Sequence, residues 1–324
     1  MASRRGCALD GVLLLDKPEG LSSNHALQRA RRILDARKAG HTGTLDPFAT
    51  GLMVLCFGEA TKFSGDMFHA DKTYLAELKL GEETDSGDRT GLPVAFEGQD
   101  PSRRPDAAQL RDVLSRLTGS IAQVPPMYSA LKRDGRPLYE YARQGIELER
   151  EPRQVTIYGI RLLEADGDRV RLEVDCSKGT YIRTLAQDIG RALGCGAHLT
   201  ALRRSRTAGF GLADAVTLER LEAMPEPAAA LLPVEALLAP LAVQRLDQAQ
   251  AARFVQGQKI GLARPAGSGP AAAGGPAVSM ATPQAAAPAE RVRVHGADGS
   301  FLGTARREGG RLVPDRLISL KETT

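Results

Sequence analysis

The first two-thirds of the chain alternates between strand-like and helix-like hydrophobic patterns. Apolar runs of strand length occupy residues 11–15 and 52–57. From Lys72 onward apolar and polar residues alternate, so a strand there has one hydrophobic face, formed by Tyr74, Ala76, Leu78 and Leu80. Residues 155–163 and 170–176 predict an antiparallel hairpin about Asp166-Gly167.

Helical spacing separates these strands. Ser22, Ser23 and Asn24 are N-cap candidates for a helix that places Leu27, Ala30 and Leu34 on one face. Residues 59–67, 106–117 and 138–144 predict further helices, and a helix after Thr180 carries Ile182, Leu185, Ile189 and Leu193 at core spacing. Hairpins with helices between them predict an α+β fold with a mixed, mainly antiparallel sheet and flanking helices, not a doubly wound parallel sheet.

Three stretches show neither the two-residue alternation of a strand nor the 3.6-residue spacing of a helix. Residues 81–91 predict a polar loop, and residues 202–206 form a basic cluster, Leu-Arg-Arg-Ser-Arg. Residues 124–136 have two prolines and end in basic residues, and a long structured loop of this kind in a compact domain is usually functional. It lies within a larger segment, residues 123–151, called the clamp segment below.

Composition changes after residue 225. We expect a main domain over residues 1–240 and a small C-terminal domain over 241–324, whose short strands near 292–294, 301–305 and 312–320 predict an all-β fold. Residues 265–289 are rich in Ala, Gly and Pro without a charged side chain, which predicts a flexible insertion.

Composition and charge narrow the class of protein. With 324 residues, 42% of them hydrophobic and 25% charged, the chain is globular, and wholesale disorder is excluded. A pI near 8.9 permits basic surfaces for nucleic acid. Trp is absent and aromatic residues make up 4%, which argues against holding long single strands by serial base stacking.

The cysteines and the N-terminus indicate the compartment. The four cysteines are widely separated and form no Cys-x-x-Cys pair, which argues against a disulfide framework or a zinc knuckle. The short apolar run at residues 12–15 is interrupted by Asp16 and Lys17, so it predicts neither a signal peptide nor a membrane span. We expect a cytoplasmic protein with reduced thiols and no membrane partner.

One loop presents a single carboxylate. In residues 40–51, Gly-His-Thr-Gly-Thr-Leu-Asp-Pro-Phe-Ala-Thr-Gly, Asp46 precedes a proline that favours an extended backbone, and three glycines permit turns and close backbone approach. Taken alone, an aspartate in such a loop is more often a turn residue than a catalyst. Familiar alternatives are missing, since the chain has no Gly-Lys-Ser/Thr phosphate loop, no Gly-x-Gly-x-x-Gly, no Gly-x-Ser-x-Gly and no His-Glu-x-x-His.

Six motifs together resemble one family. The motifs are Lys17-Pro18, the loop 40–51, Lys72-Thr73-Tyr74, Met-Tyr-Ser-Ala-Leu-Lys at 127–132, Cys-Ser-Lys-Gly-Thr-Tyr-Ile-Arg at 176–183, and Cys-Gly-Ala-His at 195–198 with Leu-Arg-Arg at 202–204. In order and at family-like spacing, they make residues 11–206 resemble the bacterial tRNA pseudouridine-55 synthases, and the C-terminal region more weakly resembles the small RNA-binding β-barrel (PUA-like domain) of these enzymes. The resemblance implies a pseudouridine synthase fold with a catalytic domain over residues 1–240, and an isomerase that uses neither cofactor nor metal.

The resemblance also implies the catalytic residues. Asp46 is the carboxylate that attacks the base or the sugar, or deprotonates the sugar as the base leaves; the sequence does not choose among these. Arg183 pairs with Asp46 and keeps it charged, although burial opposes ionisation. Tyr74 stacks on the target base and is a candidate proton acceptor at its ring carbon.

Further residues are implied to hold the substrate. Tyr181 and Leu202 wall the pocket, His41 holds the extruded nucleotide, and Lys17 supports the pocket from the first turn. Without the family, Leu202 and Tyr74 are ordinary core residues, and a lone His41 or Lys17 carries no assignment.

The implied partner is the T-arm of tRNA. A stacked uridine cannot reach a buried carboxylate, so the enzyme must flip it out at a cost of about a few kcal/mol. Backbone contacts from Lys132, Arg203 and Arg204 offset that cost in this interpretation, and the clamp segment, residues 123–151, is the RNA-clamping loop that holds the T-arm. We expect a monomer. The alternatives are a tRNA-binding folding chaperone without essential catalysis, and a small-molecule nucleotide enzyme, which the absence of a phosphate-binding lysine in the loop disfavours.

Overall fold

The computed structural model describes residues 6–262 and 290–319. The chain separates into two compact units, Met1–Leu232 and Pro233–Thr324. The insertion expected at 265–289 lies outside the described residues. Assigning catalysis to the first unit and RNA binding to the second stays a prediction.

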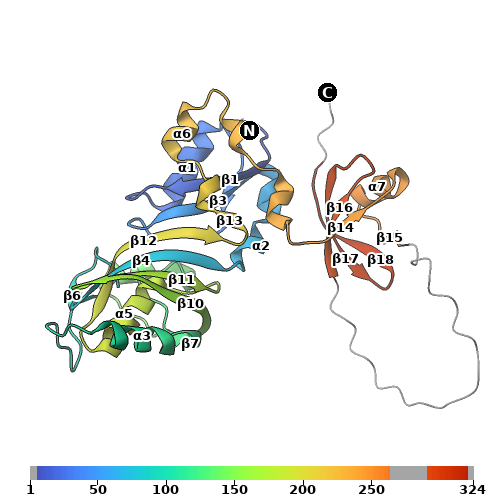
Figure 1. Cartoon of the computed structure of the whole chain (residues 1–324). Coiled ribbons are helices and arrows are strands. Elements are labelled where there is room, and N and C mark those ends of the chain that lie inside the picture. Colours follow the sequence, from blue (N-terminus) through green and yellow to red (C-terminus); the bar gives the residue numbers. More distant parts are fainter. Residues whose placement is uncertain (1–5, 263–289, 320–324) are drawn as a thin grey trace, which may run out of the picture. The chain divides into compact units, whose positions relative to one another are not determined.

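A nine-stranded sheet organises the first unit (Figure 1). All its pairings are antiparallel except that of β3 with β12, so the predicted α+β fold with a mixed, mainly antiparallel sheet is confirmed. Its main path runs β1 (Gly11–Lys17), β3 (Thr50–Phe57), β12 (Ala197–Thr207), β4 (Lys72–Leu80), β11 (Arg169–Cys176), β10 (Arg153–Asp166) and β7 (Gly119–Gln123). Two short strands join it, β2 (Ala39–His41) to β3 and β13 (Phe210–Gly211) to β12.

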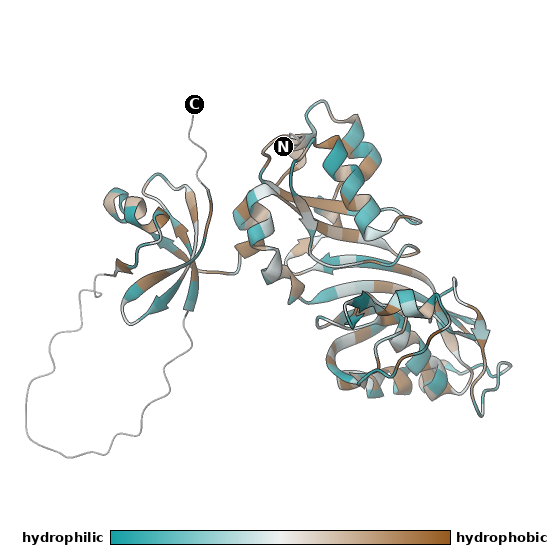
Figure 2. Ribbon diagram, turned by 180° about the vertical axis from the view of Figure 1, so that it is seen from behind, coloured by the Kyte–Doolittle hydropathy of each residue, from teal (hydrophilic) through white to brown (hydrophobic). Residues whose placement is uncertain are grey.

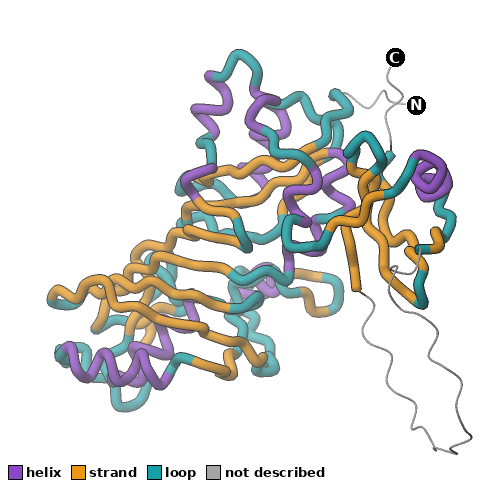
Figure 3. Tube along the Cα trace, turned by 45° about the vertical axis from the view of Figure 1, so that its right-hand side comes forward, coloured by secondary structure: helices purple, strands orange, loops and turns teal. Residues whose placement is uncertain are grey.

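Helices and two small hairpins complete this unit (Figure 3). Helices α3 (Ala107–Arg116) and α5 (Ile182–Leu193) contact each other and the sheet, and α1 (Ser23–Ile33) packs on α6 (Leu218–Ala223). The shorter helices are α2 (Ser64–Phe68) and α4 (Leu138–Ala142). The hairpins are β5 (Glu83–Thr84) with β6 (Pro93–Val94), and β8 (Lys132–Arg133) with β9 (Arg136–Pro137).

The predicted hydrophobic faces form the core. Tyr74, Ala76, Leu78 and Leu80 of β4 are all buried, as are Ile182, Leu185, Ile189 and Leu193 of α5. Each fully buried Leu or Ile contributes roughly 1.5–3 kcal/mol. Hydrophobic and hydrophilic residues are interspersed along the strands of this sheet (Figure 2). Ser22 caps α1, accepting a hydrogen bond from the His25 amide at 3.2 Å, and Gly194 ends α5 in the left-handed conformation.

Two sequence expectations need correction. Residues 202–206 are not only a basic cluster but part of β12, a strand between β3 and β4, and strand alternation therefore buries Leu202 and Arg204 while Arg203 faces the other side. Residues 81–91 are not a simple exposed loop. They include β5, and four polar residues there are buried because side chains of α5 bind them: Glu83, Thr84, Ser86 and Asp88.

A five-stranded sheet forms the second unit, as the expected small β-domain requires. Its order is β14 (Val243–Arg245), β16 (Glu290–His295), β17 (Phe301–Glu308), β18 (Arg311–Leu317) and β15 (Ile260–Gly261). Helix α7 (Gln248–Val255) buries Phe254 in the core of this unit, beside Val292 and Leu312. In the described part of the chain no helix is long and apolar enough to cross a bilayer.

Candidate active site

The loop that carries Asp46 joins β2 to β3 and is fixed from several sides. Asp46 begins a turn in which its carbonyl accepts from the Ala49 amide at 3.1 Å. One residue earlier, the Ser23 hydroxyl lies 2.8 Å from the Leu45 carbonyl and 2.7 Å from the Leu45 amide. Gly51, at φ +103°, lies where a Cβ would sit 2.3 Å from the Arg204 carbonyl. Gly51 is therefore required for close approach to β12.

Asp46 forms an ion pair with Arg183. The Arg183 Nε lies 2.9 Å from Asp46 Oδ2, and its Nη2 lies 3.4 Å from Oδ1. The Arg183 side chain is 4% exposed, whereas 34% of the Asp46 side chain remains accessible through the pocket. The guanidinium is thus held inside the protein while the carboxylate faces the space where a substrate binds.

Two further segments fix the Arg183 guanidinium. Its Nη1 donates to the Ser86 carbonyl at 3.0 Å, and its Nη2 donates to the Tyr128 carbonyl in the clamp segment at 2.6 Å. A second carboxylate, Asp88, lies 3.8 Å from Nε and is buried. Because three chain segments converge on one planar group, its orientation toward Asp46 is strongly constrained.

The surroundings perturb the acidity of Asp46. Burial raises the pKa of Asp46 above its ordinary value, and the neighbouring Asp88 adds to this, while Arg183 and then Lys17 lower it. The net direction is upward. The arginine therefore offsets only part of the cost of ionising this carboxyl group.

A pocket of about 450 Å³ surrounds Asp46. Tyr74, from β4, lies opposite Val174 of β11 and Arg204 of β12. Tyr181 is the N-cap of α5, and its backbone exchanges two hydrogen bonds with the Gln123 side chain at 3.0 and 3.3 Å. The pocket is lined by both tyrosines, Asp46, Arg183, Leu202, Arg204, Lys72, Phe68 and short segments around Thr42–Leu45, Ser129–Leu131 and Ser177–Thr180.

Both pocket tyrosines are protonated phenols at neutral pH. Burial raises the pKa of Tyr74, with Arg204 opposing it, and burial likewise raises the pKa of Tyr181. A neutral phenol can stack on a base or donate a hydrogen bond, but it is a poor proton acceptor. Among the described residues that line the pocket, the acid–base groups are therefore the Asp46 carboxylate and the Lys72 amine, whose pKa burial lowers.

Comparison with protein families decides what this arrangement is. A model described as TruB family pseudouridylate synthase (N terminal domain) matches residues 31–182. Models of the tRNA pseudouridylate synthase B C-terminal domain and of Pseudouridine synthase II TruB, C-terminal, match residues 183–239 and 242–318. The chain belongs to the TruB family. It is a pseudouridine synthase, as the motif set predicted.

Relatives and solved structures agree with this placement in the TruB family. The chain is 53% identical to tRNA pseudouridine synthase B of Burkholderia mallei over 313 residues, 96% of this chain and 97% of the relative. It is 68% identical to the Bordetella pertussis protein of the same name over 241 residues, 74% of this chain and 98% of the relative. A chain in the crystal structure of a Cbf5-Nop10-Gar1 complex shares the fold, with a TM-score of 0.67 at 23% identity, covering 95% of this chain and 84% of that one.

Two predicted residues lie beside the pocket of this TruB-family protein rather than in its lining. Lys17 is fully buried, and its Nζ donates to the carbonyls of Pro18 and Leu21, both at 2.8 Å, and of Pro47 at 3.3 Å. Burial lowers the pKa of Lys17 to about 8, partly opposed by Asp46. The lysine thereby ties the first turn of the chain to the residue that follows Asp46.

His41 lies on β2, opposite Leu55. Its Nδ1 is buried and has no hydrogen-bond partner among the described residues, and burial lowers the pKa of the ring. The imidazole is therefore neutral at neutral pH.

The three predicted RNA-contacting cations have different surroundings. Arg204 is buried, and its guanidinium donates to the carbonyls of Leu52 at 2.7 Å, Gly43 at 3.2 Å and Thr44 at 3.5 Å. Arg203 lies 2.6 Å from the Asp16 carboxylate and 3.3 Å from the Thr50 hydroxyl. Lys132 is exposed on the β8–β9 hairpin. The structure thus brings Arg204 to the pocket wall and leaves Lys132 facing solvent.

Sequence reasoning missed Asp88 and the anchoring role of Ser23. The sequence pattern places Asp88 in a polar loop and Ser23 among the N-cap candidates of a helix, and neither position by itself points to the Asp46 site. A signal for the loop was present, since Glu-Thr-Asp-Ser-Gly-Asp at 83–88 concentrates short polar residues around a glycine. Such a pattern marks a tight, internally hydrogen-bonded turn.

Proposed function

We propose that this protein isomerises the T-loop uridine at position 55 of tRNA to pseudouridine, with Asp46 as the essential catalytic residue. The observation that carries the proposal is the Asp46 carboxylate, held at 2.9 Å by a buried arginine and open to a pocket walled by two tyrosines. The names of relatives that share over half of their sequence with this chain supply the substrate class, tRNA.

The reaction needs an ionised carboxylate in every version. The bond between the uracil nitrogen and the ribose breaks, the base turns, and a bond from its ring carbon to the ribose forms, after which that carbon gives its proton to water and a proton returns to the ring nitrogen. Asp46 serves by attacking the base, by attacking the sugar, or by removing a sugar proton as the base leaves. Each role requires the negative charge that Arg183 favours and burial opposes.

The pocket walls hold the extruded base. Tyr74 and Tyr181 contribute aromatic surfaces, Leu202 contributes an apolar one, and protonated phenol hydroxyls donate hydrogen bonds to the uracil carbonyls. Because the pKa of Tyr74 is raised, we assign it to stacking and hydrogen bonding rather than to proton abstraction from the ring carbon.

Supporting residues act around this centre. Lys17 and Arg204 hold the Asp46 loop through backbone carbonyls, and His41, partly exposed at the start of that loop, contacts the flipped nucleotide. Lys132 and the adjacent Arg133, both exposed at the tip of the clamp segment, contact the T-arm backbone. The proposal includes a monomer and a cytoplasmic location, which suits the four free cysteines.

An unmodified T-arm stem-loop tests the function. The wild-type protein is expected to convert its T-loop uridine to pseudouridine, mapped by sequencing after chemical labelling, while Asp46→Asn forms none and retains affinity for the RNA. Absence of product with the wild-type protein, or equal product with both, contradicts the proposal. If Asp46→Asn and the wild type accelerate tRNA folding equally and neither forms pseudouridine, the chaperone alternative is the correct one.

A further inference from the structure

One face of α5 carries three polar residues at four-residue spacing. Arg183, Gln187 and Arg191 each lie four positions apart, so they project from the same side of the helix. All three bind the same stretch of chain, residues 83–88, called the crossing segment below. Only Arg183 belongs to the catalytic pocket, which leaves the other two without a role in the proposed function.

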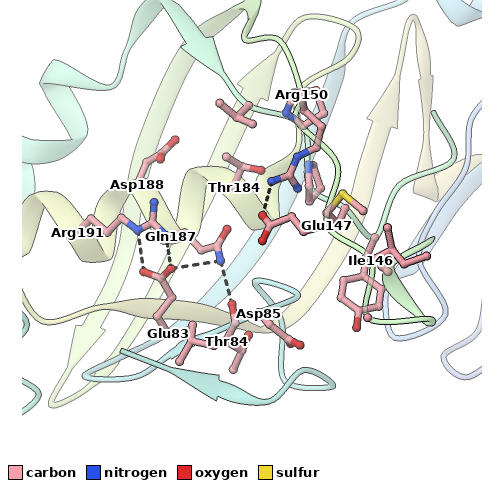
Figure 4. A pocket seen from close by; sticks show the side chains of 18 of the residues that line it. Glu83, Thr84, Asp85, Ile146, Glu147, Arg150, Thr184, Gln187, Asp188 and Arg191 are labelled. Atoms are coloured by element: carbon pink, nitrogen blue, oxygen red, sulfur yellow. Dashed lines mark hydrogen bonds and ion pairs between the residues drawn. The ribbon is translucent and has the colours of Figure 1, made fainter. Parts of the chain in front are cut away.

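The far end of this face holds a buried glutamate. Arg191 Nε lies 3.0 Å from Glu83 Oε2, and its Nη2 lies 2.5 Å from Oε1 (Figure 4). Glu83 is 1% exposed, whereas the side chain of Arg191 is 55% exposed along the edge of a second pocket of about 490 Å³. A buried carboxylate is costly unless it is paired, so this two-point contact fixes where the crossing segment begins.

Gln187 holds the middle of the segment. Its Nε2 donates to the Thr84 carbonyl at 2.9 Å and lies 3.5 Å from Glu83 Oε1, as Figure 4 shows. Farther along, Gly87 has φ +74°, and a Cβ there would lie 3.1 Å from the Arg183 Cβ and 3.2 Å from the Gln187 Cδ. The segment therefore crosses α5 in close contact between these two side chains.

The near end of the segment carries two of the partners of Arg183. The Ser86 carbonyl accepts from Arg183 Nη1, and Asp88 faces Arg183 Nε. Within the segment the Thr84 hydroxyl donates to the Asp88 carbonyl at 2.7 Å, and the Ser86 hydroxyl donates to Asp88 Oδ1 at 2.9 Å. Because the turn is internally bonded, a shift at Glu83 or Thr84 moves Ser86 and Asp88 with it.

We propose that Glu83, Gln187 and Arg191 are positioning residues for catalysis. They fix the position of the crossing segment along α5, and the segment in turn orients the Arg183 guanidinium toward Asp46. This inference rests on the proposed function and extends it to residues that do not touch the substrate pocket. A displacement of about 1 Å at a catalytic group costs up to ~10²-fold in rate. The effect should therefore fall on kcat and leave tRNA binding unchanged.

The pH profile supplies a readout that a purely structural role does not move. The charged groups around Asp46 are Arg183, Asp88 and Lys17. If the crossing segment shifts, Arg183 lies less favourably against Asp46 and lowers the pKa of Asp46 by a smaller amount. The fall in kcat on the acid side of the pH profile then moves to higher pH. Asp188, on α5 beside this network, titrates within the pH range of the experiment, because burial raises its pKa to about 6.

The experiment measures single-turnover pseudouridine formation from pH 4.5 to 8, RNA affinity, and thermal unfolding for four variants of the full chain. Gln187→Met keeps the side-chain length and removes the amide, and Arg191→Gln removes the fork that binds Glu83. We expect each to lower kcat about tenfold, within the range for a misplaced catalytic group, with unchanged affinity and a displaced acid limb. Arg191→Lys, which keeps the charge but not the fork, should recover part of the rate.

Asp188→Asn is the matched control on the same helix and should keep both the rate and the Asp46 limb of the wild type. Gln187→Met leaves the Thr84 carbonyl without this donor but no buried charge unpaired, so it is expected to destabilise the protein less than Arg191→Gln and decides the case if Arg191→Gln is unstable. Wild-type kcat and an unmoved limb in Gln187→Met overturn the inference, as does a loss that follows the folded fraction alone. A wild-type protein that forms no pseudouridine would instead refute the proposed function.

Discussion

Two basic segments that look alike in sequence have very different surroundings. Arg203-Arg204 lies on β12, where Arg204 is buried with its guanidinium bound to three backbone carbonyls and Arg203 is paired with Asp16. Lys132-Arg133 lies on the β8–β9 hairpin, where both side chains face solvent. The comparison shows that strand position, rather than local charge, decides whether an arginine is available to phosphate.

The two basic segments are therefore expected to have different roles. Arg204 joins β12 to the Asp46 loop through Gly43, Thr44 and Leu52, so its charge stabilises the catalytic geometry. The hairpin in the clamp segment has few constraints and is suited to electrostatic contact with RNA. Substitutions in the two segments should therefore affect different observables.

The largest effect is expected at Arg204. Arg204→Gln removes a buried guanidinium and leaves carbonyl groups without donors, at a cost of about 3 kcal/mol, because hydrogen bonds to charged groups are worth roughly 1.5–3 kcal/mol and orphaned partners add to the loss. Thermal unfolding should show the lower stability, and pseudouridine formation should fall at least about tenfold through displacement of Asp46.

Arg203→Gln is the adjacent control. It removes a partly exposed ion pair at 2.6 Å and should cost no more than about 1 kcal/mol. If Arg204→Gln keeps wild-type stability and instead weakens RNA binding, the assignment of Arg204 to the loop is wrong.

The pH dependence of activity should report on the buried surroundings of Asp46 and not on the exposed hairpin. The proposed function requires ionised Asp46, whose pKa is raised by burial, so activity should fall as the pH drops through a value above the ordinary aspartate range. Protonation of Asp46 does not unfold the protein. Between the pKa that Asp46 has in the unfolded chain and its higher pKa in the folded protein, the native state binds more protons than the unfolded state. Lowering the pH across that window therefore favours folding.

Rate profiles and thermal unfolding, both measured against pH, separate these effects. The acid limb should be the same in the variant with Lys132 and Arg133 both changed to Gln, since the charges that act on the Asp46 pKa are those of Arg183, Asp88 and Lys17. A limb that follows the loss of folded protein, or that moves in the hairpin variant, contradicts this prediction.

Most of the fold could be predicted from the sequence, because the spacing of hydrophobic residues along a strand or helix indicates directly which positions are buried. The β4 face, the β10–β11 hairpin and the core side of α5 follow from spacing alone, and the family motifs brought Asp46, Tyr74, Tyr181, Arg183 and Leu202 into one pocket. The surroundings of Arg204 and Asp88 were not predictable in this way. Buried polar residues interrupt the hydrophobic period, and their partners come from distant segments, so the pattern resembles an exposed loop.

The smallest effect is expected at the hairpin. Changing Lys132 and Arg133 to Gln should leave stability within about 0.5 kcal/mol, as is usual for exposed positions. RNA affinity should fall a few-fold, and the slope of log Kd against log salt should decrease by about 1–2, because each phosphate contact releases roughly 0.7–0.9 counterion. Titration of a fluorescent T-arm stem-loop at several salt concentrations measures both. Arg203→Gln, which removes equal charge per residue from a paired site, should change neither; if it flattens the salt dependence as much as the hairpin variant does, both segments contact RNA and the contrast between them fails.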